Sequence, residues 1–75
     1  MFETLKTILV DEMQIDAASI TPDAELVNDL GINSLELADL IMLCEEKFRI
    51  EINEEDIQGF LTVSDVVSYI ENKVA

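Results

Sequence analysis

Residues 29–48, "DLGINSLELADLIMLCEEKF", carry the pattern that decides the fold of this chain. Apolar residues in this stretch recur at intervals of three and four, which predicts an amphipathic helix with one face toward a core. That face consists of Leu37, Leu40, Ile41, Cys44 and Phe48. The side chain of Asn33 can cap the first turn, and Glu36 completes a capping-box pattern three residues later. The sequence therefore predicts a helix that begins at Asn33.

Three further helices are predicted on either side of this one. Apolar residues at helical spacing over about residues 2–14 predict a long first helix. A short third helix is predicted from a cap at Asn53 to a stop at Gly59. The fourth helix is predicted to start at Thr62, with Asp65 as the capping acid. Its apolar face consists of Val63, Val66, Val67, Ile70 and Val74.

The segments that connect the helices are predicted to be loops and not β-strands. Residues 15–33 lose the helical period and collect turn formers, which predicts a long loop with apolar anchors. The candidate anchors are Ile20, Leu26 and Leu30. Residues 50–52 alternate like a strand but have no partner run, so we expect a connecting loop there. The prediction is an all-α fold: a small four-helix bundle with three longer helices, a short third helix and a long first loop, in one domain over residues 1–75.

Composition and charge narrow the classes of function. The 75 residues are 49% hydrophobic, so a core can form, yet 17 acids against four bases give a formal net charge of −13. Such a surface repels nucleic acid and anionic membranes and attracts basic protein surfaces. One cysteine and no histidine predict neither an internal disulfide nor a zinc site. Since the N-terminal residues show no secretory signal or membrane span, we expect a cytoplasmic protein. We also expect it to be a monomer.

Ser34 is the candidate functional residue at the start of the central helix. Backbone N–H groups in a first helical turn lack intrahelical partners and the macrodipole is positive there, so a phosphate ester on this hydroxyl would be favoured. Because Asn33 supplies the cap, the Ser34 hydroxyl is not needed for capping. A nucleophilic serine requires a nearby base, and the chain offers only Lys6, Lys47 and Lys73 as amine bases. We therefore do not expect an enzyme.

The side of the central helix opposite its core face is also informative. At about 100° per residue, Ser34, Leu35, Ala38 and Met42 project together away from the core. The acids Asp39, Glu45 and Glu46 border them, and Glu36 lies toward the back. A contiguous apolar strip with charged borders is typical of a docking site for another protein.

These residues carry a resemblance to a known family. The stretch 29–48 resembles the serine motif and second helix of acyl carrier proteins, whose pattern runs Asp/Glu-Leu-Gly-x-Asp-Ser-Leu-Asp/Glu. The similarity continues in "FRIEINEED" (48–56) and "TVSDVVSYI" (62–70), so it covers nearly the whole chain. It implies that a dedicated transferase attaches phosphopantetheine from coenzyme A to Ser34, and that the terminal thiol then carries acyl groups as thioesters between enzymes. Asn33 departs from the family's usual Asp and removes one negative charge beside this site.

The resemblance also implies partners and site residues. The expected partners are a phosphopantetheinyl transferase, ketosynthases and other acyl-processing enzymes with basic docking patches. The docking residues implied are Leu35, Glu36, Asp39, Met42, Glu45 and Glu46. The acyl chain is expected to enter between the helices, against a lining of Leu37, Ile41, Ile52 and Val66. The motif is similar to those of both fatty-acid and polyketide carriers, and the sequence does not distinguish between these two pathways. The start at Met1 favours a free-standing subunit.

An acidic helical interaction module that binds divalent cations is the alternative function. Five residues roughly imitate positions of an EF-hand calcium loop, namely Glu54, Asp56, Gln58, Gly59 and Asp65. The match is degenerate, because the first position is Glu, the last is Asp and the loop would overlap the cap of the fourth helix. Loose binding by clustered acids is therefore the stronger form of this alternative, and no dedicated metal site is predicted.

Overall fold

The computed structural model describes residues 1–74. It contains the helices α1 (Phe2–Met13), α2 (Ser34–Phe48), α3 (Glu54–Ile57) and α4 (Val63–Val74), with a short 3-10 turn at Ala17–Ser19. The all-α class, the three longer helices, the short third helix and the long first loop are thereby confirmed. No helix within the described residues is both long enough and apolar enough to cross a membrane.

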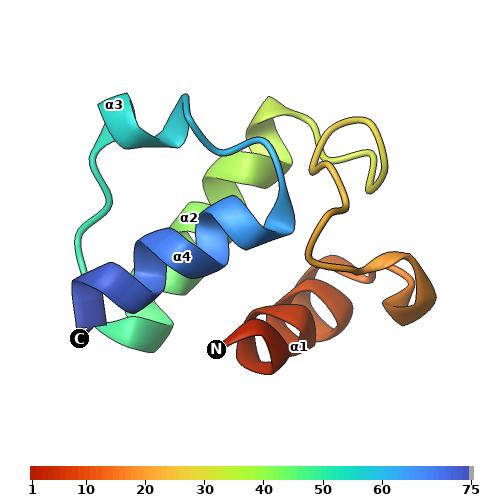
Figure 1. Ribbon diagram of the computed structural model, residues 1–75, viewed down its shortest axis with the longest axis horizontal. Helices are drawn as coiled ribbons and strands as arrows, with labels where there is room; N and C mark the ends of the chain where they lie inside the picture. The colour runs from red at the N-terminus through yellow and green to blue at the C-terminus, as the bar shows by residue number, and fades with distance from the viewer. Residues whose placement is uncertain (75) are drawn as a thin grey trace.

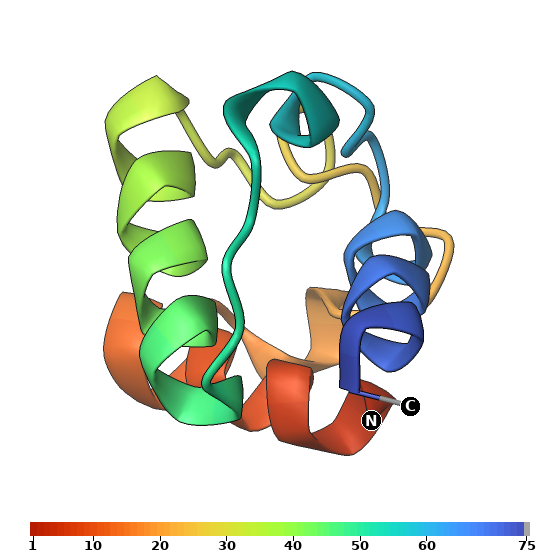
Figure 2. The same ribbon diagram turned by 90° about the vertical axis from the view of Figure 1, so that its left-hand side faces the viewer.

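The longer helices enclose the core from three sides. α1 packs against both α2 and α4. In Figure 1, α4 lies in front of α2, and α3 lies at the upper edge of the molecule. The rotated view in Figure 2 places α2 and α4 on opposite sides, with α1 beneath them and α3 above. The space between α2 and α4 is therefore closed below by a long helix and above by a four-residue helix with no buried residue.

The core follows from the apolar faces that the sequence predicts. Fully buried side chains come from all three longer helices: Leu5 and Leu9 of α1, Leu40 and Cys44 of α2, and Val63, Val66 and Ile70 of α4. Removing one such aliphatic side chain from water is worth about 1.5–3 kcal/mol, so these positions carry most of the packing energy. One predicted member of the α4 core face is wrong: Val74, the last residue of α4, is 47% exposed.

The long first loop is fixed to the start of α4. Ile20 and Leu26 are buried as predicted, and Leu30 packs partly against the core. The backbone N–H of Leu26 donates to the carbonyl oxygen of Leu61 at 2.9 Å, beside an isolated antiparallel bridge between Glu25 and Thr62. These backbone contacts hold the loop that leads into the first turn of α2.

The two later helix starts differ in how they are capped. Asp65 acts as predicted, because its carboxylate accepts hydrogen bonds from the backbone N–H groups of Thr62 (2.9 Å) and Leu61 (3.0 Å). Asn53 occupies the N-cap position of α3, which confirms the predicted start of this helix, but its side chain makes no capping hydrogen bond. Its amide nitrogen instead lies 3.5 Å from a carboxylate oxygen of Asp56.

Candidate functional site

The first turn of α2 presents Ser34 to solvent. Asn33 Oδ1 accepts a hydrogen bond from the backbone N–H of Glu36 at 2.8 Å, and Glu36 Oε1 accepts one from the backbone N–H of Asn33 at 3.2 Å. This reciprocal pair is the predicted capping box. Ser34 is the first helical residue, is exposed and takes no part in the pair. Its hydroxyl is therefore accessible beside the positive end of a 15-residue helix.

The turn before Ser34 has a fixed backbone conformation. Gly31 has a φ of 69°, a left-handed conformation that costs glycine little and other residues more. The next residue, Ile32, is 2% exposed, and its backbone N–H donates to the carbonyl oxygen of Leu26 at 2.9 Å. Because a buried side chain precedes Asn33, the capping residue and the serine are held at a defined place on the surface.

The strip predicted on the outward side of α2 lies in solvent. Leu35 is 79% exposed and Met42 is 61% exposed, and Ala38 between them is exposed as well. The acids Asp39 and Glu46 are also exposed. An apolar strip therefore extends along α2 from the residue next to Ser34, with negative charge at its border.

Two acids of this border already have partners within the chain. Glu36 is engaged in the capping box, and Glu45 Oε2 accepts a hydrogen bond from the backbone N–H of Ile52 at 2.9 Å. Both side chains are half-buried. The hydrogen bond of Glu45 connects α2 to the segment that leads into α3, a contact that the sequence pattern did not predict.

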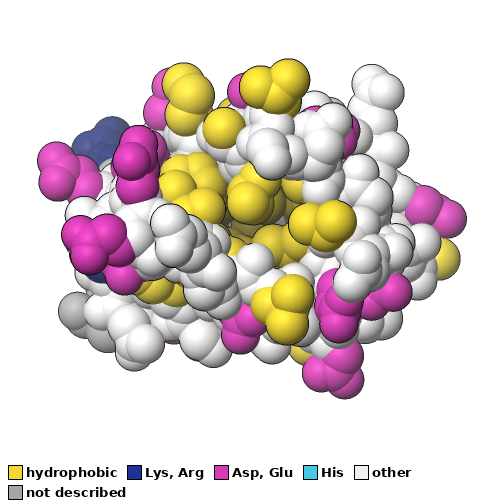
Figure 3. All heavy atoms as spheres, turned by 90° about the horizontal axis from the view of Figure 1, so that it is seen from above, with side chains coloured by type: hydrophobic (Ala, Val, Ile, Leu, Met, Phe, Trp, Pro, Cys, Tyr) yellow, Lys and Arg dark blue, Asp and Glu magenta, His cyan; other side chains and the backbone are white. Residues whose placement is uncertain are grey.

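The face that carries α3 and the first turn of α2 is hollowed. Figure 3 shows hydrophobic side chains at the floor and around the rim of this hollow. Among the predicted lining residues, Ile41, Ile52 and Val66 are buried in the core and Leu37 is partly buried against it. The predicted lining residues therefore belong to the core or pack against it.

Cys44 lies in the same core and is fully buried. Burial, and to a smaller degree the negative charge of Glu45, raises the pKa of the Cys44 thiol to about 12. The thiolate is the nucleophilic form of cysteine, so this thiol is unreactive at neutral pH.

Two of the three acids of the cation-binding alternative, Asp56 and Asp65, have structural roles. Asp56 Oδ2 accepts a hydrogen bond from the Tyr69 hydroxyl at 2.7 Å, and Asp65 caps α4. Within residues 1–74, no three Asp, Glu, His or Cys side chains are gathered as a metal-binding group.

Tyr69 is a structural residue whose role the sequence pattern did not reveal. Besides bonding to Asp56 of α3, its ring packs edge-on against Phe60, with ring centres 5.2 Å apart. The Lys73 ammonium lies 5.4 Å from the centre of the same ring. A lone tyrosine among apolar residues at helical spacing predicts packing but gives no sign of a partner thirteen residues away. Through Tyr69, α4 holds α3 over the hollow.

Comparisons with known proteins agree with this site. A family model described as a phosphopantetheine attachment site matches residues 3–70. The acyl carrier protein of Helicobacter pylori strain J99 is 47% identical over 76 residues, which cover 100% of this chain and 97% of that protein. The acyl carrier protein of Solidesulfovibrio magneticus is 49% identical over 71 residues, which cover 95% of this chain and 91% of that protein.

A solved structure has the same fold. The crystal structure of an acyl carrier protein from Thermotoga maritima matches with a TM-score of 0.85, over 96% of this chain and 84% of that one. At 24% sequence identity this likeness concerns the fold alone. The family model and the relatives span nearly the whole sequence, and the chain therefore belongs to the acyl carrier proteins, the family of acyl-group carriers that bear phosphopantetheine.

Proposed function

We propose that phosphopantetheine is attached to the hydroxyl of Ser34 and that residues 1–75 act as one carrier domain. The observation that carries the assignment is the exposed hydroxyl in the first turn of α2, where Asn33 and Glu36 already provide the cap. A phosphodiester at this place lies near backbone N–H groups at the positive end of the helix. When bound, the group supplies a thiol at the end of a flexible arm, and the chain supplies its attachment point.

The attachment is tested by mass spectrometry. Incubation with coenzyme A and a phosphopantetheinyl transferase should add one phosphopantetheinyl group to the protein. Ser34→Ala should abolish this mass increase and leave the helix content unchanged, because the capping hydrogen bonds do not use the serine hydroxyl. Ser19→Ala is the matched control, since Ser19 is exposed on the first loop, and it should be modified like the parent protein. Modification that persists in Ser34→Ala would refute the assignment.

The transferase, ketosynthases and other acyl-processing enzymes are proposed to dock on α2. The exposed side chains of Leu35 and Met42 supply apolar contact beside the attachment point, and Asp39 and Glu46 supply charge for basic partner patches. The hydrogen bonds of Glu36 and Glu45 within the chain make these two acids less available, so they are the weaker members of the predicted docking set.

Association kinetics separate the two kinds of docking contact. Asp39→Lys should slow association with a basic partner enzyme, since charges at the border of an interface act mainly on encounter rates. Met42→Ala should instead speed dissociation, because it removes apolar contact area. Thermal unfolding provides the control, since both side chains are exposed and neither substitution disturbs the core. Identical rate constants for both variants and the parent protein would contradict docking on this strip.

A further inference from the structure

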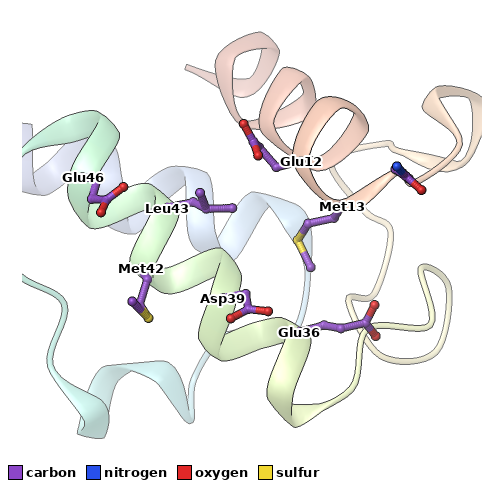
Figure 4. Close-up of a pocket in the computed structure, with 8 residues that line it drawn as sticks. Glu12, Met13, Glu36, Asp39, Met42, Leu43 and Glu46 are labelled. Carbon is purple, nitrogen blue, oxygen red and sulfur yellow. The ribbon is translucent and has the colours of Figure 1, made fainter.

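A groove runs between the C-terminal end of α1 and α2, on the far side of α2 from the α3 hollow. Figure 4 shows it with Glu12 and Met13 on α1 and with Asp39, Met42, Leu43 and Glu46 on α2. Its volume is about 470 Å³. The groove is therefore a surface built by two helices.

The groove combines an apolar floor with acidic sides. Met13 and Leu43 are half-buried, and both side chains point into the space between the helices in Figure 4. The carboxylates of Glu12, Asp39 and Glu46 are exposed, and none of the described residues that line the groove is a lysine or an arginine. The groove thus offers apolar contact and exposed carboxylates at the same place.

Met42 joins this groove to the strip of the proposed docking site. It lines the edge of the groove, and its side chain is also the apolar member of the strip farthest from Ser34. A partner that covers Met42 therefore reaches the opening of the groove without leaving the proposed interface.

The chemistry of the groove matches one kind of side chain. An arginine carries a long aliphatic stem that packs on apolar surface, and a planar guanidinium that binds carboxylates through two parallel hydrogen bonds. Lysine carries a compact, strongly hydrated charge, so it cannot form the two parallel hydrogen bonds to a carboxylate that a guanidinium forms. The flexible thioether of Met13 adapts to the shape of an inserted stem.

We propose that the groove between α1 and α2 is a second docking subsite, which receives an arginine side chain from the docking surface of a partner enzyme. This inference rests on the proposed docking of partners on α2 and extends their recognition to α1. Enzymes whose docking surface places an arginine in the groove while covering Met42 gain contacts with Glu12 and Met13. Enzymes that lack it dock on the α2 strip alone, so the groove distinguishes between partners of one carrier.

The three methionines of the chain provide the test. In protein labelled with ¹³C at the methionine methyl groups, Met13 reports on the groove, Met42 on the strip, and Met1 on a region outside the groove. The labelled protein is titrated separately with the phosphopantetheinyl transferase and with a ketosynthase from the same host, without coenzyme A. With at least one enzyme, the Met13 and Met42 signals should both shift, while Met1 stays in place.

A pair of charge reversals then tests the contact itself. Glu12→Lys should raise the Kd for the enzyme that shifts Met13 by at least about tenfold, because an arginine would then face a like charge. Glu71→Lys is the matched control: it changes the net charge equally, and Glu71 is an exposed residue of α4 outside the groove. This control should change the Kd by less than about twofold. Circular dichroism verifies that both variants remain folded.

The outcomes separate this inference from the proposed function. A shift of Met42 without Met13 for both enzymes would overturn the groove subsite and leave docking on α2 intact. Equal Kd values for Glu12→Lys and Glu71→Lys would overturn it as well. If neither methyl signal moved although Ser34 were still modified, both the groove and the strip would be wrong, while the attachment site would stand.

Discussion

At the scale of single residues, Asp65 shows how one carboxylate makes folding depend on pH. Its two hydrogen bonds from the backbone N–H groups of Thr62 and Leu61 favour the charged form and lower the pKa of the carboxyl. In the unfolded chain this pKa is about 3.9, so the unfolded state binds the proton first as the pH falls. The stabilisation by Asp65 is therefore present above about pH 4 and is lost as the pH falls through the folded-state value.

We expect Asp65→Asn to lower the free energy of unfolding at pH 7 and to have progressively less effect below pH 4. Urea unfolding of the variant and the parent protein at pH 7 and pH 3 measures this difference. Asp11→Asn is the control, since Asp11 is exposed on α1 and caps no helix. An equal difference at both pH values would show that the charge of Asp65 does not contribute.

Local patterns also explain which parts of the site could be predicted from the sequence. The Asn33–Glu36 pair joins residues only three positions apart, so the capping-box pattern can be recognised in the sequence. The exposure of Leu35 and Met42 follows from the phase of the same helix. Asn53 satisfies the same spacing rule without capping, because α3 is too short for propensity to fix its first turn.

At the scale of elements, sequence patterns predict the helices but not the hydrogen bonds between separate segments. The apolar faces of α2 and α4 follow from periodicity, whereas Val74 continues the α4 pattern and is nevertheless exposed. The hydrogen bond from Ile52 to Glu45 and the bridge between Glu25 and Thr62 join residues from different segments. No regular spacing in the sequence marks such pairs, so they can be identified only in the folded structure.

The Glu45–Ile52 hydrogen bond gives a prediction for the segment between α2 and α3. Glu45→Ala leaves the half-buried N–H of Ile52 without its acceptor, which should lower the free energy of unfolding by about 1 kcal/mol. Hydrogen exchange at the Ile52 amide should become faster, because the segment opens locally more often. Glu46→Ala removes the same charge from an exposed position and is the matched control. Unchanged exchange at Ile52 in Glu45→Ala would contradict this role.

At the scale of the whole molecule, a high charge surrounds a small core. The net charge of −13 on 75 residues opposes compaction, so added salt should stabilise the protein by screening self-repulsion. In Figure 2, α3 lies above the core between α2 and α4, and the hydrogen bonds of Glu45 and Tyr69 hold α3 and the segment before it in place. α3 itself contributes no buried residue to the core, so displacing it exposes no core side chain of its own.

This arrangement leads to the prediction that the acyl chain inserts between α2 and α4. Ile41, Ile52 and Val66 are buried in the core and offer an aliphatic environment, and each buried methylene is worth about 0.8 kcal/mol. Cargo that is buried only in the folded state must also stabilise that state. The melting temperature of the thioester-loaded protein should therefore exceed that of the free-thiol form, and the difference should rise with chain length until the space is filled.

Salt provides the control for this experiment. Both forms should melt at higher temperature in added salt, whereas the difference due to the acyl chain should remain, because burial of methylenes does not depend on screening. Ile41→Ala enlarges the space between the helices, so the free-thiol form should become less stable while the longest chain recovers part of the loss. Core methyl NMR signals that stay unchanged as saturated chains lengthen, together with a constant melting temperature, would mean that the cargo stays outside the bundle.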